Sequence, residues 1–266
     1  MKRVVHGTPI TPARLFPSLG GEFASFCVSF ANPSQIDLAI KHTGKRGVLI
    51  LDNGAWTLRG TGESYPRAEF WAWANYYQSV CPQAVAVIPD VIDGDERANL
   101  EEISRAIRYG DSEHPERAMS IWHTSESQDY LALQMRLLNF VGVGSSGAYD
   151  VQRKRAAYLE RLETVRQTRE ALLAVHGRAP WVHLMRGLGV LKRLPWAESA
   201  DSCNVAINHC RQREGLGDDR ARALAERIND EIQSAAGALP VRNHAGSNFD
   251  PAPQPDEYES RQPRLF

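Results

Sequence analysis

The sequence predicts a (β/α)8 barrel, also called a TIM barrel, and three observations favour this fold. Short apolar runs rich in β-branched residues alternate with longer amphipathic segments, which is typical of parallel βαβ units. Eight such runs occur within about 240 residues, which matches the size and strand count of this barrel. The 266 residues, 42% of them hydrophobic, suffice to bury one large core. An open doubly wound sheet is the structural alternative.

Each expected strand is an apolar run that ends near glycine, proline or small polar residues. Several runs contain Val and Ile in succession, as in "VLIL" and "VAVI", and these residues favour a pleated strand. The runs occupy residues 3–7, 26–31, 47–56, 84–92, 118–124, 140–146, 181–189 and 201–207.

Three of the intervening segments carry clear helix patterns. Residues 67–80 place large apolar side chains at helical spacing. Residues 95–110 begin with acidic side chains and end in Gly110, which suits the start and stop of a helix. Residues 151–177 are rich in strong helix formers and also end in glycine, so we expect a long helix there.

The composition changes near the end of the chain. Residues 241–266 are rich in proline and polar side chains and show no apolar period, so they cannot bury a core alone. We therefore expect residues 1–240 to form a single catalytic barrel domain and residues 241–266 to form a Pro-rich polar C-terminal tail.

Charge and cysteine content exclude several classes of protein. The net charge of −1 gives no global positive field, so contact with nucleic acid would need a local basic patch. None of the four cysteines forms a CxxC pair, so the cysteine spacing indicates no disulfide framework and no structural zinc site. The chain opens without the apolar run of a signal peptide and has no stretch long enough to span a bilayer. These features predict a cytoplasmic protein with reduced thiols and no membrane partner.

Polar and small residues follow the apolar runs. In a barrel, the carboxyl ends of the strands and the loops after them build the active site. A single Asp at a strand end is usually a helix cap or a turn residue. Three carboxylates and a histidine at successive strand ends are harder to explain as caps and indicate an active site. The residues at these ends are Asp52, Asp90, His123, Gly144, Met185 and Asp201.

Two short segments add possible binding groups. In "DNGAW", Asn53 and Gly54 predict a tight turn, and Trp56 is either a core residue or a stacking platform at the rim. In "GVGSSG", backbone N–H groups lack large neighbouring side chains and could hold a carbonyl or phosphate group. This segment lacks the spacing of a dinucleotide-binding fingerprint.

At these residues the sequence resembles the tRNA-guanine transglycosylase family in its wider sense, which includes DNA-modifying members from phages and genomic islands. The resemblance runs from the third expected strand to the eighth, as motifs in the right order. "LDNGAW" looks like the family's Asp-Ser-Gly-Gly-aromatic segment, and "IPDVIDG" is similar to the strand with a base-reading Asp. "VGVGSS", "VHLMRGLG" and "ADSCN" resemble its Val-Gly-Gly loop, its Leu-Met-Gly segment and its nucleophile segment.

The resemblance implies a base exchange that breaks an N-glycosidic bond. Asp201 would be the nucleophile, because a carboxylate can trap the sugar covalently at its anomeric carbon. Asp52 would be the general acid and base, and Asp90 would bind the Watson–Crick edge of a guanine-like base. Adjacent carboxylates raise one another's pKa, which suits such a division of roles.

The resemblance also implies how the base is held. Trp56 and Met185 would sandwich the base, and the backbone of Gly144 and Ser145 would contact its carbonyl group. His123 stands where the family usually has glutamine.

Two departures from the family favour DNA over tRNA. The family's zinc cluster is missing, because Cys203, His209 and Cys210 do not have its spacing, so we expect no metal and no other cofactor. The chain is also shorter than the tRNA-modifying members. The expected enzyme therefore exchanges guanine in DNA for a 7-deazaguanine derivative through a covalent glycosyl-aspartate intermediate.

Three alternatives stay open. In the first alternative, the substrate of the exchange is tRNA. In the second, the enzyme is a nucleosidase or transferase that acts on free deazaguanine nucleosides. A catalytically silent partner subunit is the non-enzymatic alternative, and the presence of Asp52 and Asp201 argues against it.

A base inside duplex DNA must be flipped out before reaction, which requires phosphate contacts. Two basic segments at the expected barrel rim could supply them, although a solvated helix face explains each equally well. Their residues are Arg153, Lys154 and Arg155 in the first segment, and Arg211, Arg213, Arg220 and Arg222 in the second.

Overall fold

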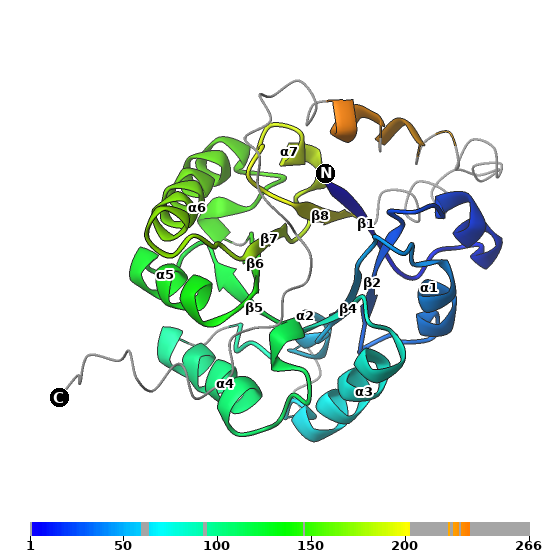
Figure 1. Ribbon diagram of the computed structural model, residues 1–266, viewed down its shortest axis with the longest axis horizontal. Helices are drawn as coiled ribbons and strands as arrows, with labels where there is room; N and C mark the ends of the chain where they lie inside the picture. Colours follow the sequence, from blue (N-terminus) through cyan, green and yellow to red (C-terminus); the bar gives the residue numbers. More distant parts are fainter. Residues whose placement is uncertain are drawn as a thin grey trace.

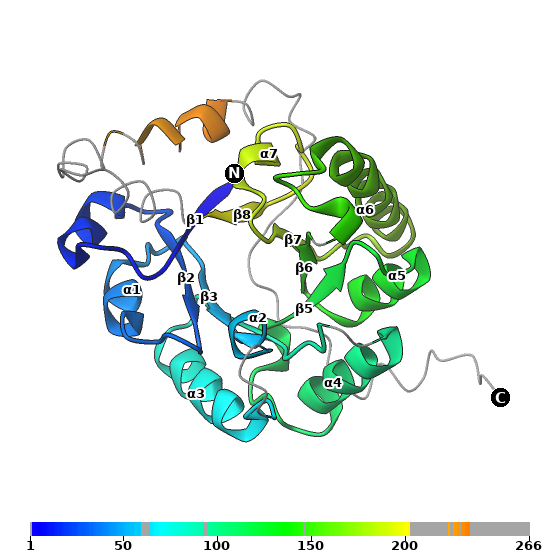
Figure 2. The same ribbon diagram turned by 180° about the vertical axis from the view of Figure 1, so that it is seen from behind.

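The protein folds as a closed barrel of eight parallel strands with helices on the outside (Figures 1 and 2). This computed structural model describes residues 2–59, 64–92, 95–145, 147–202, 223, 226–228 and 230–234. Neighbouring strands in the sequence pair with each other, and the eighth strand pairs with the first to close the ring. The predicted (β/α)8 barrel is confirmed, and the open-sheet alternative is wrong.

All eight expected strands are present, although most are shorter than the apolar runs that predicted them. The strands are β1 (Arg3–Gly7), β2 (Ser25–Ser29), β3 (Leu49–Asp52), β4 (Ala84–Val87), β5 (Ala118–His123), β6 (Phe140–Gly144), β7 (Trp181–Leu184) and β8 (Ser199–Ser202). Their register pairs Ser29 with Asp52 and His123 with Gly144, so residues at the ends of adjacent strands lie side by side.

The last strand begins earlier than the sequence indicated. The expected strand started at Asp201, whereas β8 starts at Ser199 and places Asp201 opposite Val5 of β1. Small residues such as Ser199 and Ala200 form this strand because they fill positions packed on both sides, although they lack the apolar pattern used to find it. Residues 203–207 of the expected run lie outside the described residues.

Helices surround the barrel and connect its strands. They are α1 (Ile36–His42), α2 (Ala55–Leu58), α3 (Arg67–Val80), α4 (Glu96–Arg108), α5 (Gln128–Leu137), α6 (Arg155–His176) and α7 (Leu188–Leu191). Short 3₁₀ turns occur at η1 (Ala13–Leu19), η3 (Pro115–Arg117) and η4 (Gly147–Tyr149). The three helices expected from sequence are α3, α4 and α6. Asp95 caps α4 through the Ala98 N–H, and Gly177 ends α6 in the left-handed conformation.

Two apolar layers result from the alternation of side chains along each strand. The larger layer lies between the strands and the outer helices. The smaller layer fills the barrel interior, and its buried residues are Val5, Val48, Ile50, Val85, Val87, Met119, Ile121 and Phe140. The interior layer thus forms the floor beneath the carboxyl ends of the strands.

The division between the barrel domain and the tail falls on residues that the structure does not describe. Residues 226–228 and 230–234 are helical, and residues 235–266 lie outside the described part of the chain. Among the described helices, none is long and apolar enough to cross a membrane.

Candidate active site at the carboxyl end of the barrel

Side-chain alternation carries three of the expected site residues into the barrel interior. Ile50 and Ile121 belong to the interior layer, and Asp52 and His123 follow them by two residues at the ends of β3 and β5. Asp201 lies near the end of β8 and is 8% exposed. These side chains therefore converge above the apolar floor of the barrel.

The turn after β3 fixes the Asp52 carboxylate. Its Oδ2 accepts a hydrogen bond from the Gly54 N–H at 3.1 Å. Gly54 has a φ of 71°, and a Cβ atom there would come within 2.8 Å of the Ala31 backbone nitrogen. Only glycine meets both constraints without strain. The tight turn expected from "DNG" is present for this reason.

Burial, together with the negative charges of Asp90 and Asp201, raises the pKa of Asp52 to about 6. The Ser29 hydroxyl and the Gly54 N–H stabilise the anion and offset part of this effect. A carboxyl with this pKa can both give and take a proton near neutral pH. The charges of Asp90 and Asp201 thus act on Asp52, which places the three carboxylates near one another.

Asp90 is held by partners on both of its oxygen atoms. Its Oδ1 accepts a hydrogen bond from Asn53 Nδ2 at 2.8 Å, and its Oδ2 lies 2.9 Å from His123 Nε2. The Asn53 side chain is itself fixed, because Nδ2 also donates to the Ile88 carbonyl at 2.9 Å. The Tyr65 hydroxyl donates to the Asn53 carbonyl at 2.8 Å. Asp90 therefore holds His123 in a defined orientation.

The environment of His123 favours its protonated form. Burial lowers the pKa of His123, but the hydrogen bond to Asp90 and the charges of Asp90 and Glu126 outweigh burial and leave that pKa raised. Glu126 Oε2 accepts the His123 backbone N–H at 2.7 Å, and its Oε1 accepts Asn99 Nδ2 at 3.0 Å. These contacts tie the loop after β5 to α4.

Gly144 leaves space beside this histidine. A Cβ atom at Gly144 would lie 3.4 Å from His123 Nδ1 and 3.3 Å from Ile121 Cγ2. The absence of a side chain therefore leaves His123 Nδ1 facing the interior end of the barrel. Ser145 follows directly, and its buried hydroxyl has no hydrogen-bond partner among the described residues. Both are polar groups available to a ligand.

Two polar contacts from described residues reach the Asp201 carboxylate, both on Oδ1. The Arg186 backbone N–H donates a hydrogen bond to Oδ1, and His183 Nε2 lies 3.4 Å from the same atom. Arg186 has a φ of 58°, a left-handed conformation that is costly for a residue with a side chain. This conformation aims its N–H at the carboxylate.

The two expected stacking residues differ in their surroundings. Trp56 lies in α2 and is 65% exposed, so it is not a core residue. The Arg59 guanidinium lies 5.7 Å from the centroid of its ring. Met185 is half-buried and packs against the interior layer. Whether the two side chains enclose a base stays a prediction.

One of the two expected basic segments is exposed beside the connection after β7. The Arg155 guanidinium donates to the Gly189 carbonyl at 2.7 Å. The largest effect on the pKa of Asp150 is a hydrogen bond from the Arg153 backbone N–H, which lowers it. The charges of Arg186 and Arg153 lower this pKa further, so both arginine side chains lie near Asp150. The exposed residues of the segment are Arg153, Lys154 and Arg155.

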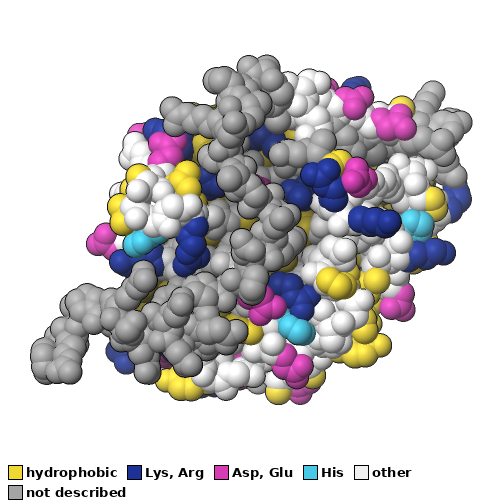
Figure 3. Space-filling model, viewed as in Figure 1, with side chains coloured by type: hydrophobic (Ala, Val, Ile, Leu, Met, Phe, Trp, Pro, Cys, Tyr) yellow, Lys and Arg dark blue, Asp and Glu magenta, His cyan; other side chains and the backbone are white. Residues whose placement is uncertain are grey.

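The second expected basic segment, which includes Arg211 and Arg213, lies outside the described residues. On the face shown in Figure 3, the visible Lys and Arg side chains are interspersed with Asp and Glu side chains. That face thus gives no continuous positive surface in its visible part.

Sequence reasoning missed several residues that hold this site. Asn53 and His183 contact the side chains of Asp90 and Asp201, and Glu126 accepts the backbone N–H of His123. A usable signal existed for His183, because it interrupts an apolar strand two residues before Met185. An interior position for Met185 implies an interior position for His183.

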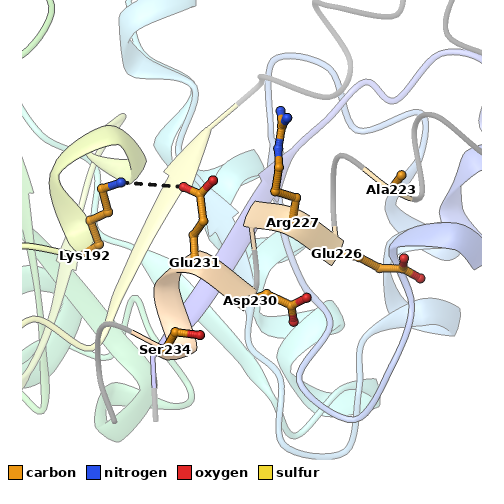
Figure 4. A pocket seen from close by; sticks show the side chains of 7 residues that line it. All are labelled: Lys192, Ala223, Glu226, Arg227, Asp230, Glu231 and Ser234. Carbon is orange, nitrogen blue, oxygen red and sulfur yellow. Dashed lines mark ion pairs between the residues drawn. The ribbon is translucent and has the colours of Figure 1, made fainter. Parts of the chain in front are cut away.

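A surface groove of about 690 Å³ lies elsewhere, between α7 and the helical residues near the end of the described chain (Figure 4). It is lined by charged side chains, and Lys192 forms an ion pair with Glu231 at 3.6 Å. None of its lining residues contacts the site described above. Within the described residues, no group of three or more His, Cys, Asp or Glu side chains could hold a metal ion.

Comparison with known proteins supports the fold. No family model matches the sequence, and no curated protein sequence matches it significantly. Tryptophan synthase from M. tuberculosis with BRD0059 bound is similar in structure, with a TM-score of 0.50, 13% identity, and 87% of this chain and 93% of that chain covered. The aminoacrylate-bound form of the same enzyme has a TM-score of 0.50 and 15% identity, with 90% of this chain and 94% of that chain covered.

These neighbours are enzymes with TIM-barrel folds. Because their identity to this chain is so low, the likeness shows the fold alone. The chain is thus a TIM-barrel protein whose candidate active site combines Asp52, Asp90, His123 and Asp201.

Proposed function

We propose that this protein is a transglycosylase that exchanges guanine in DNA for a 7-deazaguanine derivative through a covalent glycosyl-aspartate intermediate. The observation that carries the proposal is the convergence of Asp201, Asp52 and the Asp90–His123 pair at one end of the barrel. The order of these residues along the chain matches the motifs that resemble the tRNA-guanine transglycosylase family.

The proposed reaction uses Asp201 as the nucleophile. A carboxylate oxygen of Asp201 attacks C1′ of the target sugar, and the bond between C1′ and the guanine breaks. The electron pair of that bond stays on the leaving base, which takes a proton at N7 or N9 from Asp52. The positive charge that develops on the sugar is stabilised by the carboxylate.

The second half of the reaction reverses these steps with a new base. The incoming 7-deazaguanine derivative gives its N9 proton to Asp52 and attacks C1′. The bond between the sugar and Asp201 breaks, and its electron pair returns to the carboxylate. A pKa of about 6 lets Asp52 serve in both halves near neutral pH.

Base recognition in this proposal depends on the space beside Gly144. His123 Nδ1 faces that space, and Asp90 fixes the ring from behind. A raised pKa makes His123 a hydrogen-bond donor on both nitrogens at lower pH, which suits a purine carbonyl oxygen. The exposed ring of Trp56 offers a stacking surface at the same end of the barrel.

Arg153, Lys154 and Arg155 are the proposed phosphate contacts, and Arg186 joins them because its charge acts on the same acidic neighbour. A flipped nucleotide needs such contacts on its flanking backbone. Substituting one of them should weaken binding of DNA uniformly across sequences and reduce its salt dependence.

The proposal is tested by incubating the protein with plasmid DNA, bulk tRNA or free guanine nucleosides together with a labelled 7-deazaguanine base. We expect label in DNA, and none with the Asp201→Asn variant. Label only in tRNA, or only in free nucleosides, would replace DNA with that substrate class. No label in any of the three would contradict base exchange itself.

A further inference from the structure

A line of side chains, half-buried at Arg3 and Trp181 and buried at Ser199 and His183, runs through the barrel interior toward Asp201. It starts at Arg3, whose guanidinium lies 4.3 Å from the centroid of the Trp181 ring. Trp181 Nε1 donates to Ser199 Oγ at 2.7 Å, and Ser199 Oγ lies 2.9 Å from His183 Nδ1. The other nitrogen of His183 faces Asp201 Oδ1 at 3.4 Å. The line crosses between β7 and β8, which pair with each other.

The hydrogen-bond donors along this line determine the form of His183. An indole N–H is only a donor, so Ser199 Oγ accepts from Trp181. If His183 Nδ1 also donated to Ser199 Oγ, the buried serine hydroxyl would have no acceptor among the described residues. An unpaired buried donor is costly. Ser199 therefore donates to His183 Nδ1, and the histidine carries its proton on Nε2.

This arrangement explains an otherwise unpartnered group. His183 is 1% exposed, and its Nε2 has no hydrogen bond of normal geometry among the described residues. A proton on Nε2 points at Asp201 Oδ1, and contacts of this kind often tighten when substrate binds. Oδ1 also accepts the Arg186 N–H, whereas no hydrogen bond from a described residue reaches Oδ2. The Oδ2 atom is left for attack on a sugar.

We infer that His183 is a positioning residue for the nucleophile: Ser199 and Trp181 hold its proton on Nε2, from which it donates to Asp201 Oδ1 and leaves Oδ2 facing the substrate. This inference rests on the proposed function for the role of Asp201, but the hydrogen-bond chain itself does not.

The chain is tested without substrate by NMR of protein with ¹⁵N-labelled histidine. The His183 signals are assigned by their loss in His183→Gln. We expect His183 to be protonated on Nε2 and unprotonated on Nδ1. Asp201→Ala should shift the Nε2 proton signal, and the control Asp90→Ala should not. A proton on Nδ1 in the wild-type protein would overturn the inference. An Nε2 proton signal that does not shift in Asp201→Ala would also overturn it.

Two substitutions of similar size test the consequence for reaction. His183→Leu removes the donor, and His183→Gln keeps an N–H near the position of Nε2. We expect His183→Leu to slow formation of the denaturant-resistant adduct by about 10- to 100-fold and His183→Gln to recover most of that loss. The KM for the incoming base should stay unchanged in both. A glutamine variant as slow as the leucine variant would overturn the role of the donor.

Failure of the inference and failure of the proposed function give different results. A wild-type protein that forms no adduct with DNA, tRNA or nucleosides contradicts the proposed function, and the histidine spectra then decide the hydrogen-bond chain alone. If His183→Leu does not fold, Ser199→Ala takes its place. That variant should give a mixture of the two forms of His183, and a single Nε2-protonated form would contradict the role of Ser199.

Discussion

The raised pKa of Asp52 predicts that this side chain makes the folded protein less stable near neutral pH. Substituting Asp52 with Asn removes the charge and keeps an oxygen that can accept the Gly54 N–H. The new amide can donate to the Ser29 hydroxyl, which stabilises the Asp52 anion in the wild-type protein. We therefore expect Asp52→Asn to abolish base exchange and to stabilise the fold, as is common at active sites.

The magnitude follows from the difference between the pKa values of the folded and unfolded states. Burial moves the pKa of Asp52 from 3.8 to about 6. At about 1.4 kcal/mol per pKa unit, ionised Asp52 costs the folded state at most about 3 kcal/mol. The sign is that of a raised carboxyl pKa: the folded state binds more protons between pH 4 and 6, so wild-type stability falls as pH rises through this range.

The measurement is the free energy of unfolding in urea for wild type and Asp52→Asn from pH 4 to pH 8. The two proteins should have similar stability near pH 4, and the variant should be more stable by about 1–3 kcal/mol above pH 6. Glu160→Gln is the control, because it removes an exposed carboxylate from α6. A stability difference that is constant over this range, or a variant less stable at pH 8, would contradict a destabilising charge on Asp52.

Three further changes test other parts of the site. Asn53→Ala should lower the free energy of unfolding by about 1–3 kcal/mol, measured in urea, because it leaves the Asp90 Oδ1 and the Ala55 N–H without a partner; a neutral effect would contradict the role of this amide. Gly54→Ala should cost at least about 1–2 kcal/mol, since its φ of 71° and the nearby backbone both oppose a Cβ atom; thermal unfolding measures this, with Gly177→Ala as an uncrowded control of similar φ. Trp56→Ala should change stability by less than about 0.5 kcal/mol but raise the KM for the incoming base about tenfold, and an unchanged KM would rule out stacking.

The fold was predictable because most strands carry their own local signal. Parallel strands buried on both sides appear as short apolar runs, and "VLIL" and "VAVI" mark β3 and β4 in this way. The apolar run at residues 47–56 is longer than β3, because the apolar Ala55 and Trp56 belong to α2. It also misplaced β8, whose first residues are small and polar and therefore lack an apolar pattern.

The candidate site was predictable only in part. Asp52, Asp90 and His123 follow recognisable strands, and the closure of the barrel brings such ends together. The contacts that orient them join residues far apart in the chain, as Asn53 does with Asp90 and Glu126 does with Asn99. Nothing local in the sequence specifies those pairs, because they depend on the register of neighbouring strands and on loop conformation.

The left-handed conformation of Arg186 could not be predicted from the sequence either. Such a conformation usually belongs to glycine, and Gly187 follows directly. Only the geometry around Asp201 explains why the arginine adopts it, since its N–H donates to that carboxylate.

Locating the covalent bond to the sugar tests the proposed role of Asp201 directly. Wild-type protein is incubated with guanine-containing DNA, denatured and digested, and the peptides are analysed by mass spectrometry. We expect a nucleotide attached to the peptide that contains Asp201, and no adduct in Asp201→Asn. Attachment to a different residue, or an undiminished adduct in Asp201→Asn, would contradict that role.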